Sequence, residues 1–424
     1  MALFFFFILI FLSYRLLRIK ILSPLSLTIL FSFILIGIIY PILKVYSFSN
    51  FQEAKIFISE LSEALIIISI IFFFWIIGYM SLGKIKPLHI KINYIYKDRH
   101  FANFLLILGL FLYLLTYLYT GVDFLSSFND PLGTRFLLMS KPGAFYLKSL
   151  GLWTMWSGWY LNLFLLLNNN QINKFYLIVK FILIILISLP LGQRSYIVFP
   201  FLTLIITLHY FNLIKISRII FLFILMLFIV PILGLYRELG NSVEGFSFSL
   251  LVENIETIFE NKESIFYVIS ERLNNLSFFS NFLEFKNSIS YDITNSISSF
   301  LNFFTPSSAY SPKELDLNTI LTMKDLGSTE FGTYAYTSFA EWFLILGNFG
   351  YVFFGFFSGL LNRLIINSIN KIGYNFFCLV LFSDLFFLKY PFIKINDIDN
   401  VLLIIFIVYA FFLYLCFNSF RKYF

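Results

Sequence analysis

The sequence has 424 residues, of which 59% are hydrophobic and only 12% are charged. Water-soluble domains carry about twice that charged fraction, so the composition indicates an integral membrane protein. Runs such as 70–77 and 401–412 are apolar on every face, which excludes the alternating strands of a membrane β-barrel. The formal charge of +7 is therefore informative through its distribution across a membrane, not as a sign of nucleic-acid binding.

Apolar stretches near twenty residues long recur along the chain and predict an all-α membrane protein of about eleven transmembrane helices. The first stretch has no basic residue before it and no small-residue cleavage site after it, so we interpret it as a retained helix. The predicted spans are 2–14, 22–43, 63–82, 101–120, 147–167, 176–190, 196–213, 219–236, 335–360, 374–390 and 400–418.

Basic residues fix the predicted orientation, because short cytoplasmic connections collect Lys and Arg. With the N-terminus outside and the C-terminus inside, the basic run 84–99 and Arg363 fall in cytoplasmic connections. The chain then divides into helices one to eight (1–236), a large extracytoplasmic loop (237–334) and helices nine to eleven (335–424). This loop holds thirteen Asp and Glu against six Lys and Arg.

The large loop contains apolar positions at helical spacing with glutamates between them, which predicts an amphipathic helix. Such a helix either lies on the bilayer or bundle, or forms a lid over a substrate cleft. The apolar positions are Leu251, Ile255, Phe259, Phe266, Ile269 and Leu273.

Glu341 is the carboxylate of most interest, because it lies inside the predicted span 335–360, near its outer end. A charge within a spanning segment costs about 2.5–3.5 kcal/mol on insertion scales and is a functional candidate by default. Its carboxylate could act as a general base, or it could accept a hydrogen bond from a sugar hydroxyl. The alternative is a buried ion pair that fixes helix packing. Asp384 lies inside the span 374–390. For this carboxylate, a packing or hydrogen-bonding role is an equal alternative to a functional one.

Two arginines are predicted at outer helix ends. Arg194 lies in the turn of the hairpin 176–213, and Arg237 lies where the eighth helix emerges, beside Glu238. A guanidinium at headgroup depth can hold phosphate oxygens through two parallel hydrogen bonds. Contact with lipid phosphates is the alternative for Arg194, and a solvated helix end is the alternative for Glu238.

The polar run 305–336 precedes the ninth predicted helix and is rich in Pro, Gly and small residues. Irregular backbone beside a membrane is tolerated where it lines a cavity or faces water, so this run is a candidate site. Lys313 is a candidate ligand residue there, with simple solvation as its alternative. Aromatic residues in and after the run could offer ring faces and hydrogen bonds to sugars: Tyr310, Tyr334, Tyr336 and Trp342.

No histidine falls on the predicted outer face, so a catalyst there would depend on carboxylates, arginines and tyrosines. The two cysteines lie in apolar segments, which argues against a disulfide framework or a metal site, and no phosphate-binding glycine loop is present. We therefore predict neither a metal nor another cofactor. Gly355 and Gly359 form a GxxxG pattern that permits close helix packing.

Taken together, three patterns resemble the O-antigen (Wzy-type) polymerases, also called oligosaccharide repeat-unit polymerases. They are LGQRSYIVFPFLTLI at 191–205, GLYRELG at 234–240, and TPSSAYSPKE followed by GTYAYTSFAEWFLILGNFGYVFFGFFSG within 305–359. Ser307 and Ser308 depart from the pattern, since many relatives carry an Arg after the Pro.

The resemblance implies a metal-independent glycosyltransferase with a GT-C-like helix bundle in the bacterial inner membrane. Such an enzyme extends surface polysaccharide on the outer leaflet, using polyprenyl-diphosphate-linked oligosaccharide as substrate. Membrane lipid and a chain-length regulator protein are the expected partners, and nucleic acid is not. It further implies that Arg194 and Arg237 neutralise the diphosphate and that Glu341 acts on the acceptor hydroxyl.

Three other functions stay open. One is a membrane-bound acyltransferase, which is weakened by the lack of a suitably placed histidine. An O-antigen ligase has a similar plan but is expected to use an outer-face histidine, which this sequence lacks. A flippase or other polysaccharide transporter is expected to show internal repeats and charges near the bilayer midplane. We detect no repeat, and the candidate charges cluster at the outer edge.

Overall fold

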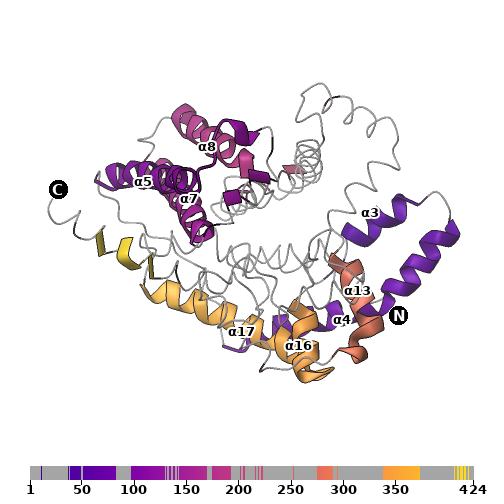
Figure 1. Cartoon of the computed structure of the whole chain (residues 1–424). Helices are drawn as coiled ribbons and strands as arrows, with labels where there is room; N and C mark the ends of the chain where they lie inside the picture. The colour runs from indigo at the N-terminus through magenta and orange to yellow at the C-terminus, as the bar shows by residue number, and fades with distance from the viewer. Residues whose placement is uncertain are drawn as a thin grey trace. The chain divides into compact units, whose positions relative to one another are not determined.

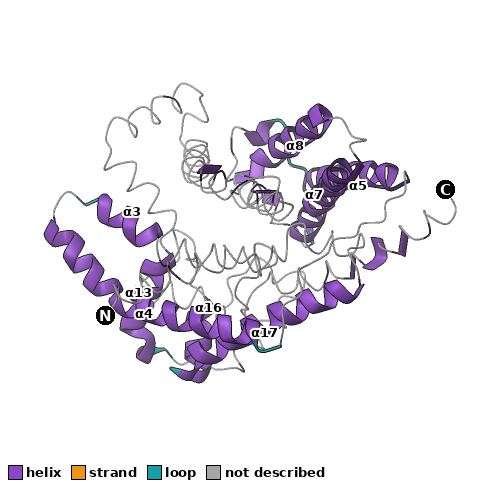
Figure 2. Ribbon diagram, turned by 180° about the vertical axis from the view of Figure 1, so that it is seen from behind, coloured by secondary structure: helices purple, strands orange, loops and turns teal. Residues whose placement is uncertain are grey.

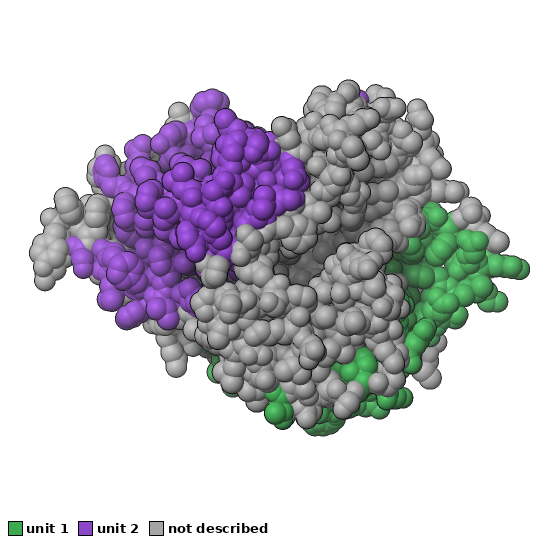
Figure 3. All heavy atoms as spheres, viewed as in Figure 1, with its two compact units in different colours: residues 1–88, 258–368, 389–401 green, residues 89–257, 369–388, 402–424 purple. Residues whose placement is uncertain are grey.

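The computed structural model describes mainly residues 39–48, 51–82, 97–128, 143–169, 174–191, 275–289 and 338–372, with single positions and pairs elsewhere (Figure 1). These residues are helical, and no strand occurs among them, which confirms the predicted all-α class for the described part of the chain. The chain divides into two compact units, coloured in Figure 3. Unit 1 comprises 1–88, 258–368 and 389–401, and unit 2 comprises 89–257, 369–388 and 402–424.

Unit 1 is built on α4 (Phe51–Met80) and α17 (Phe349–Ile372), two long and largely apolar helices. The short helix α3 (Tyr40–Tyr46) packs on the start of α4, where the Tyr40 and Phe57 rings lie 6.2 Å apart. Two further short helices, α13 (Asn275–Phe285) and α16 (Ser338–Leu346), complete the described part of this unit. Figures 1 and 2 show α13 beside α4 from opposite sides.

The α4–α17 interface depends on glycine. A Cβ on Gly355 would overlap the carbonyl of Ile71, and a Cβ on Gly359 would overlap that of Trp75. The two helices therefore approach backbone to backbone at the predicted GxxxG pattern, which confirms that prediction. Because 71 faces 355 and 75 faces 359, α4 and α17 run in the same direction.

Unit 2 contains α5 (Lys97–Thr120), α7 (Ala144–Asn169) and α8 (Lys174–Ser188). The central helix, α7, is buried along most of its length between its neighbours. Hydrogen bonds join α8 to the other two helices: the Trp159 indole N–H donates to the Leu177 carbonyl at 2.9 Å, and the Tyr113 hydroxyl donates to the Ile187 carbonyl at 2.9 Å.

Two short 3-10 turns close one end of this bundle, where η2 (Ser126–Phe128) packs against η3 (Leu189–Leu191). Before η2, the Asp123 carboxylate accepts the Ser126 backbone N–H at 2.9 Å. This hydrogen bond stabilises the charged carboxylate and holds the pKa of Asp123 below its ordinary value.

Two of the described helices are long and apolar enough to cross a membrane, as judged by length and composition. They run from Gln52 to Met80, 29 residues, and from Arg99 to Thr120, 22 residues. The predicted spans 63–82, 101–120, 147–167 and 176–190 fall within α4, α5, α7 and α8, apart from a few end residues. However, α4 begins at Phe51, twelve residues before its predicted span.

Most of the other predicted spans lie outside the described residues. The predicted amphipathic helix around 251–273 does so too, apart from Val252, which is helical and exposed. The described helix of the acid-rich loop is α13, which begins just after that segment. Its buried positions Phe279, Phe282 and Leu283 give it one apolar face, as expected for an amphipathic helix.

Candidate functional site

Glu341 lies in the first turn of α16 and is fully buried. The residues on either side, Ala340 and Trp342, are buried as well. A carboxylate in the first turn of a helix is favoured by the unsatisfied N–H groups and the positive end of the helix dipole. The short helix thus supplies one part of the electrostatic support that a buried carboxylate needs.

The predicted span 335–360 is not one helix, and here the prediction was wrong. The chain leaves the helical path at Gly347, whose φ is +62°, and starts again at Phe349. The two pieces fold back on each other: Trp342 packs on Phe353 with ring centroids 5.3 Å apart, and Phe343 stacks on Tyr351 at 5.3 Å.

Glycine makes this turn possible. The left-handed backbone at Gly347 is strained for residues with a side chain. A Cβ on Gly350 would overlap the carbonyl of Trp342. With nine residues, α16 is about 13 Å long, so it cannot cross a hydrocarbon core of about 30 Å.

The loop helix α13 supports α16. Phe282 of α13 meets Phe343 edge-on with ring centroids 5.9 Å apart, and the Lys286 ammonium lies 5.2 Å from the centroid of the same ring. Phe279 meets Tyr351 of α17 edge-on at 6.1 Å. Phe343 is therefore enclosed by two helices from distant parts of the sequence.

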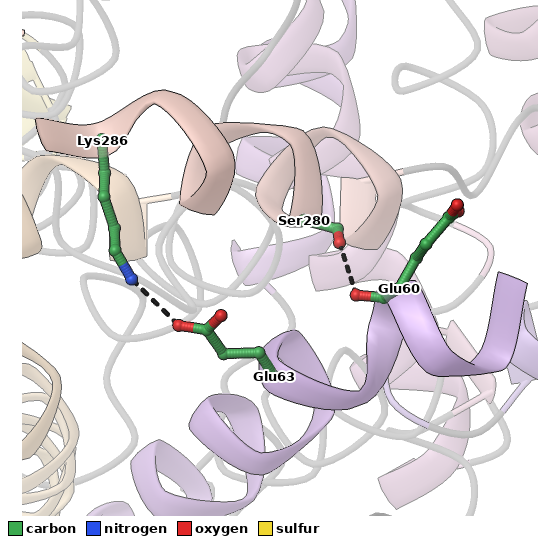
Figure 4. Close-up of polar contacts among 4 residues, drawn as sticks. All are labelled: Glu60, Glu63, Ser280 and Lys286. Atoms are coloured by element: carbon green, nitrogen blue, oxygen red, sulfur yellow. Dashed lines mark hydrogen bonds and ion pairs between the residues drawn. The ribbon is translucent and has the colours of Figure 1, made fainter. Parts of the chain in front are cut away.

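Polar contacts fasten α13 to α4 as well (Figure 4). The Ser280 hydroxyl donates to the Glu60 carbonyl at 3.0 Å, and the Lys286 ammonium lies 2.9 Å from the Glu63 carboxylate. The Glu63 side chain is 60% exposed, so this ion pair is worth only about 0.2–1 kcal/mol and weakens with salt. Aromatic packing fixes α13 more strongly than the charges do.

The two sides of α16 have different partners. Glu341 and Phe343 are two positions apart, which places them about 200° apart around a helix. Phe343 packs on Phe282 of α13 and on Tyr351 of α17, so Glu341 lies on the side of α16 opposite to these two contacts. The helix therefore holds the carboxylate away from the aromatic cluster that anchors it.

Of the predicted site residues, only Glu341 and Trp342 are among those described. Trp342 is buried in the α16–α17 turn, and its predicted contact with sugar stays a prediction. The other predicted residues, and Asp384, lie outside the described part of the chain: Arg194, Arg237, Glu238, Tyr310, Lys313, Tyr334 and Tyr336.

Two buried or half-buried cations were missed by the sequence reasoning. Lys148 of α7 is fully buried, with its ammonium 5.0 Å from the centroid of the Phe145 ring. Lys180 of α8 is half-buried and donates to the Asn103 side-chain oxygen at 2.7 Å. Both lie inside predicted spans, so the rule that singled out Glu341 could have found them.

Arg363, predicted to follow the ninth span on the cytoplasmic side, lies within α17, because this helix continues past the predicted end at 360 to Ile372, and its side chain is buried. Its guanidinium lies 5.7 Å from the centroid of the Tyr79 ring, and Tyr79 in turn stacks on Trp75. A guanidinium over an aromatic face is stabilised by the ring's negative face, which helps to offset the cost of burial.

Among the described residues, no cluster of three His, Cys, Asp or Glu side chains could hold a metal ion. No protein-family model, curated protein or solved structure matches this chain.

Proposed function

We propose that this protein is a membrane glycosyltransferase that polymerises lipid-linked oligosaccharide repeat units, with Glu341 as its acceptor-binding carboxylate. The observation on which this proposal depends is that Glu341 is fully buried in the first turn of α16, inside the segment that bears the family resemblance. A carboxylate is expensive to keep in an apolar environment and is a functional candidate there.

The proposed reaction needs no nucleotide. An acceptor hydroxyl oxygen attacks the anomeric carbon of the donor chain, and the bond from that carbon to the diphosphate oxygen breaks. Polyprenyl diphosphate leaves with the bonding electrons, and the hydroxyl proton passes to Glu341. Arg194 and Arg237 are the proposed cations for the charge that develops on the diphosphate.

The proposed setting is the bacterial inner membrane, with about eleven spanning helices, the N-terminus outside and the C-terminus in the cytoplasm. The parallel course of α4 and α17 supports one part of this arrangement, because the proposed topology has both helices entering the membrane from the same side. The docking of α13 near the start of α4 also fits a loop on that side. Membrane lipid and a chain-length regulator are proposed partners.

Glu341→Gln tests the proposal most directly. The substitution keeps the shape of the side chain but removes the proton acceptor, so kcat for chain extension should fall by about 10²–10⁴-fold. The measurement is repeat-unit extension by purified protein on polyprenyl-diphosphate-linked substrate, with products separated as a glycan ladder.

Glu53→Gln is the matched control, since Glu53 is an exposed carboxylate on α4. It should extend chains at the wild-type rate. An E341Q protein that extends chains as fast as the control would remove Glu341 from the mechanism.

In a deletion strain, a single repeat unit left on lipid supports a polymerase, whereas full-length chains that are not displayed support a ligase.

A transporter is the second candidate, and one observation favours it. Many transporters bind their substrate or coupling ion at interrupted helices, and α16 is a short helix broken from α17 at Gly347. Proteoliposomes containing the purified protein separate the two functions. Movement of lipid-linked repeat units across the bilayer without any increase in glycan length would select the transporter.

A further inference from the structure

Phe343 is a position at which the acid-rich loop touches the helix that carries Glu341. Its ring packs against Phe282 of α13 and Tyr351 of α17, and the Lys286 ammonium lies over it. Since α16 has only nine residues and turns sharply at Gly347, these ring contacts govern how it is oriented.

Lys286 joins three helices at this point. It follows directly after α13, its ammonium is 2.9 Å from Glu63 of α4, and the same group lies 5.2 Å from the Phe343 ring centroid of α16. The side chain is only 17% exposed, so its contacts are held in a confined place.

We infer that Lys286 is a positioning residue, which sets the orientation of Glu341 by holding Phe343 on the opposite side of α16. Phe343 and Glu341 belong to the same helical turn, so a shift of the Phe343 backbone moves the Glu341 backbone with it. Removing the ammonium releases Phe343 from α4, and the small rotation of α16 that follows moves the Glu341 carboxylate.

This inference deepens the proposed function, and its relevance to catalysis rests on that function. A displacement of about 1 Å at a reacting group can lower a rate by about a hundredfold. The acid-rich loop thus takes part in the site through Lys286 even where it makes no contact with substrate. The Glu63 carboxylate, being exposed, makes this support sensitive to salt.

The first test needs no enzyme assay. The protein has five tryptophans, and Trp342 is next to Glu341 on α16. With 5-fluorotryptophan incorporated, the Trp342→Phe variant identifies the Trp342 fluorine resonance. Lys286→Gln should shift or broaden that resonance, Lys286→Arg should leave it as in wild type, and the exposed control Lys55→Gln should not move it.

Glu63→Gln tests the positioning role of Lys286 independently, because it removes the ion pair while leaving Lys286 over the Phe343 ring. It should move the Trp342 resonance in the same direction by a smaller amount. A Trp342 resonance that is the same in K286Q as in K55Q overturns the inference. If K286Q does not fold, E63Q decides: a shifted resonance supports the inference, and an unchanged one overturns it.

The second test uses chain extension. K286Q should lower kcat by about ten- to a hundredfold with KM nearly unchanged, and K286R should restore it. A rise in KM with kcat unchanged would make Lys286 a substrate-binding residue instead and overturn the inference. If wild-type protein extends no chains, the proposed function fails, and the fluorine resonance alone decides the positioning role.

Discussion

At the scale of single residues, several charged side chains of the described helices are buried or half-buried, and their contacts show how packing accommodates a charge. Arg363 has the Tyr79 ring beneath it, and Lys180 has the Asn103 amide oxygen. These contacts provide a packing explanation for each cation. Glu341 is fully buried as well, on a helix whose described ring contacts are made by its neighbours Trp342 and Phe343.

Gly347 gives a prediction at this scale, since its φ of +62° is the left-handed backbone on which the α16–α17 turn depends. A Cβ there would meet no atom within 4 Å, so a substitution introduces backbone strain without a clash. Gly347→Ala should lower the free energy of unfolding by about 1–2 kcal/mol. Gly347→Asn should cost less, because Asn tolerates this backbone better.

Thermal unfolding in detergent, followed by tryptophan fluorescence, measures both variants. Equal stability of the Ala variant and wild type would contradict the fold-back turn. Equal losses for Ala and Asn would indicate that the space at this position, rather than its backbone, is restrictive.

At the scale of elements, glycine also sets the distance between α5 and α7. A Cβ on Gly151 would lie 2.6 Å from the Tyr113 nitrogen, and one on Gly158 would lie 2.7 Å from the Ala102 carbonyl. Because 151 faces 113 and 158 faces 102, the two helices are antiparallel. Backbones can approach this closely only where side chains are absent or small.

Gly151→Leu should therefore force α5 and α7 apart. Overpacking of this kind typically costs about 1–3 kcal/mol. It should also weaken the Tyr113–Ile187 hydrogen bond, which depends on the position of α5. Thermal unfolding measures the loss, with Leu118→Val as control, because Leu118 is 78% exposed on α5. If both variants unfold at the same temperature, the glycine contact does not limit helix packing.

At the scale of the whole molecule, the charge pattern predicts which ends of the helices face outward. Lys84 follows α4 and belongs to the predicted cytoplasmic run, whereas Asn287 follows α13 in the acid-rich loop. Alkaline phosphatase, which is active only outside the cytoplasm, should be active when fused after Asn287 and inactive when fused after Lys84. The reverse result would overturn the predicted orientation.

The sequence alone predicted the helical class and the positions of α5, α7 and α8 to within a few residues. It could do so because a continuous apolar run of about twenty residues satisfies its backbone hydrogen bonds within one helix. It also singled out Glu341 and the GxxxG contact of α17, since a buried carboxylate and a paired glycine are unusual in any apolar segment.

The tertiary structure decided what depends on contacts between distant segments. The run 335–360 is largely apolar on both sides of Gly347, so hydropathy does not reveal a helix that ends there and folds back. The fold-back is favoured by Tyr351, Phe353 and Phe282, and the last of these comes from a loop sixty residues earlier. Composition determines that a segment is helical and apolar, whereas ring packing and backbone crowding determine where it turns and which side of it carries the carboxylate.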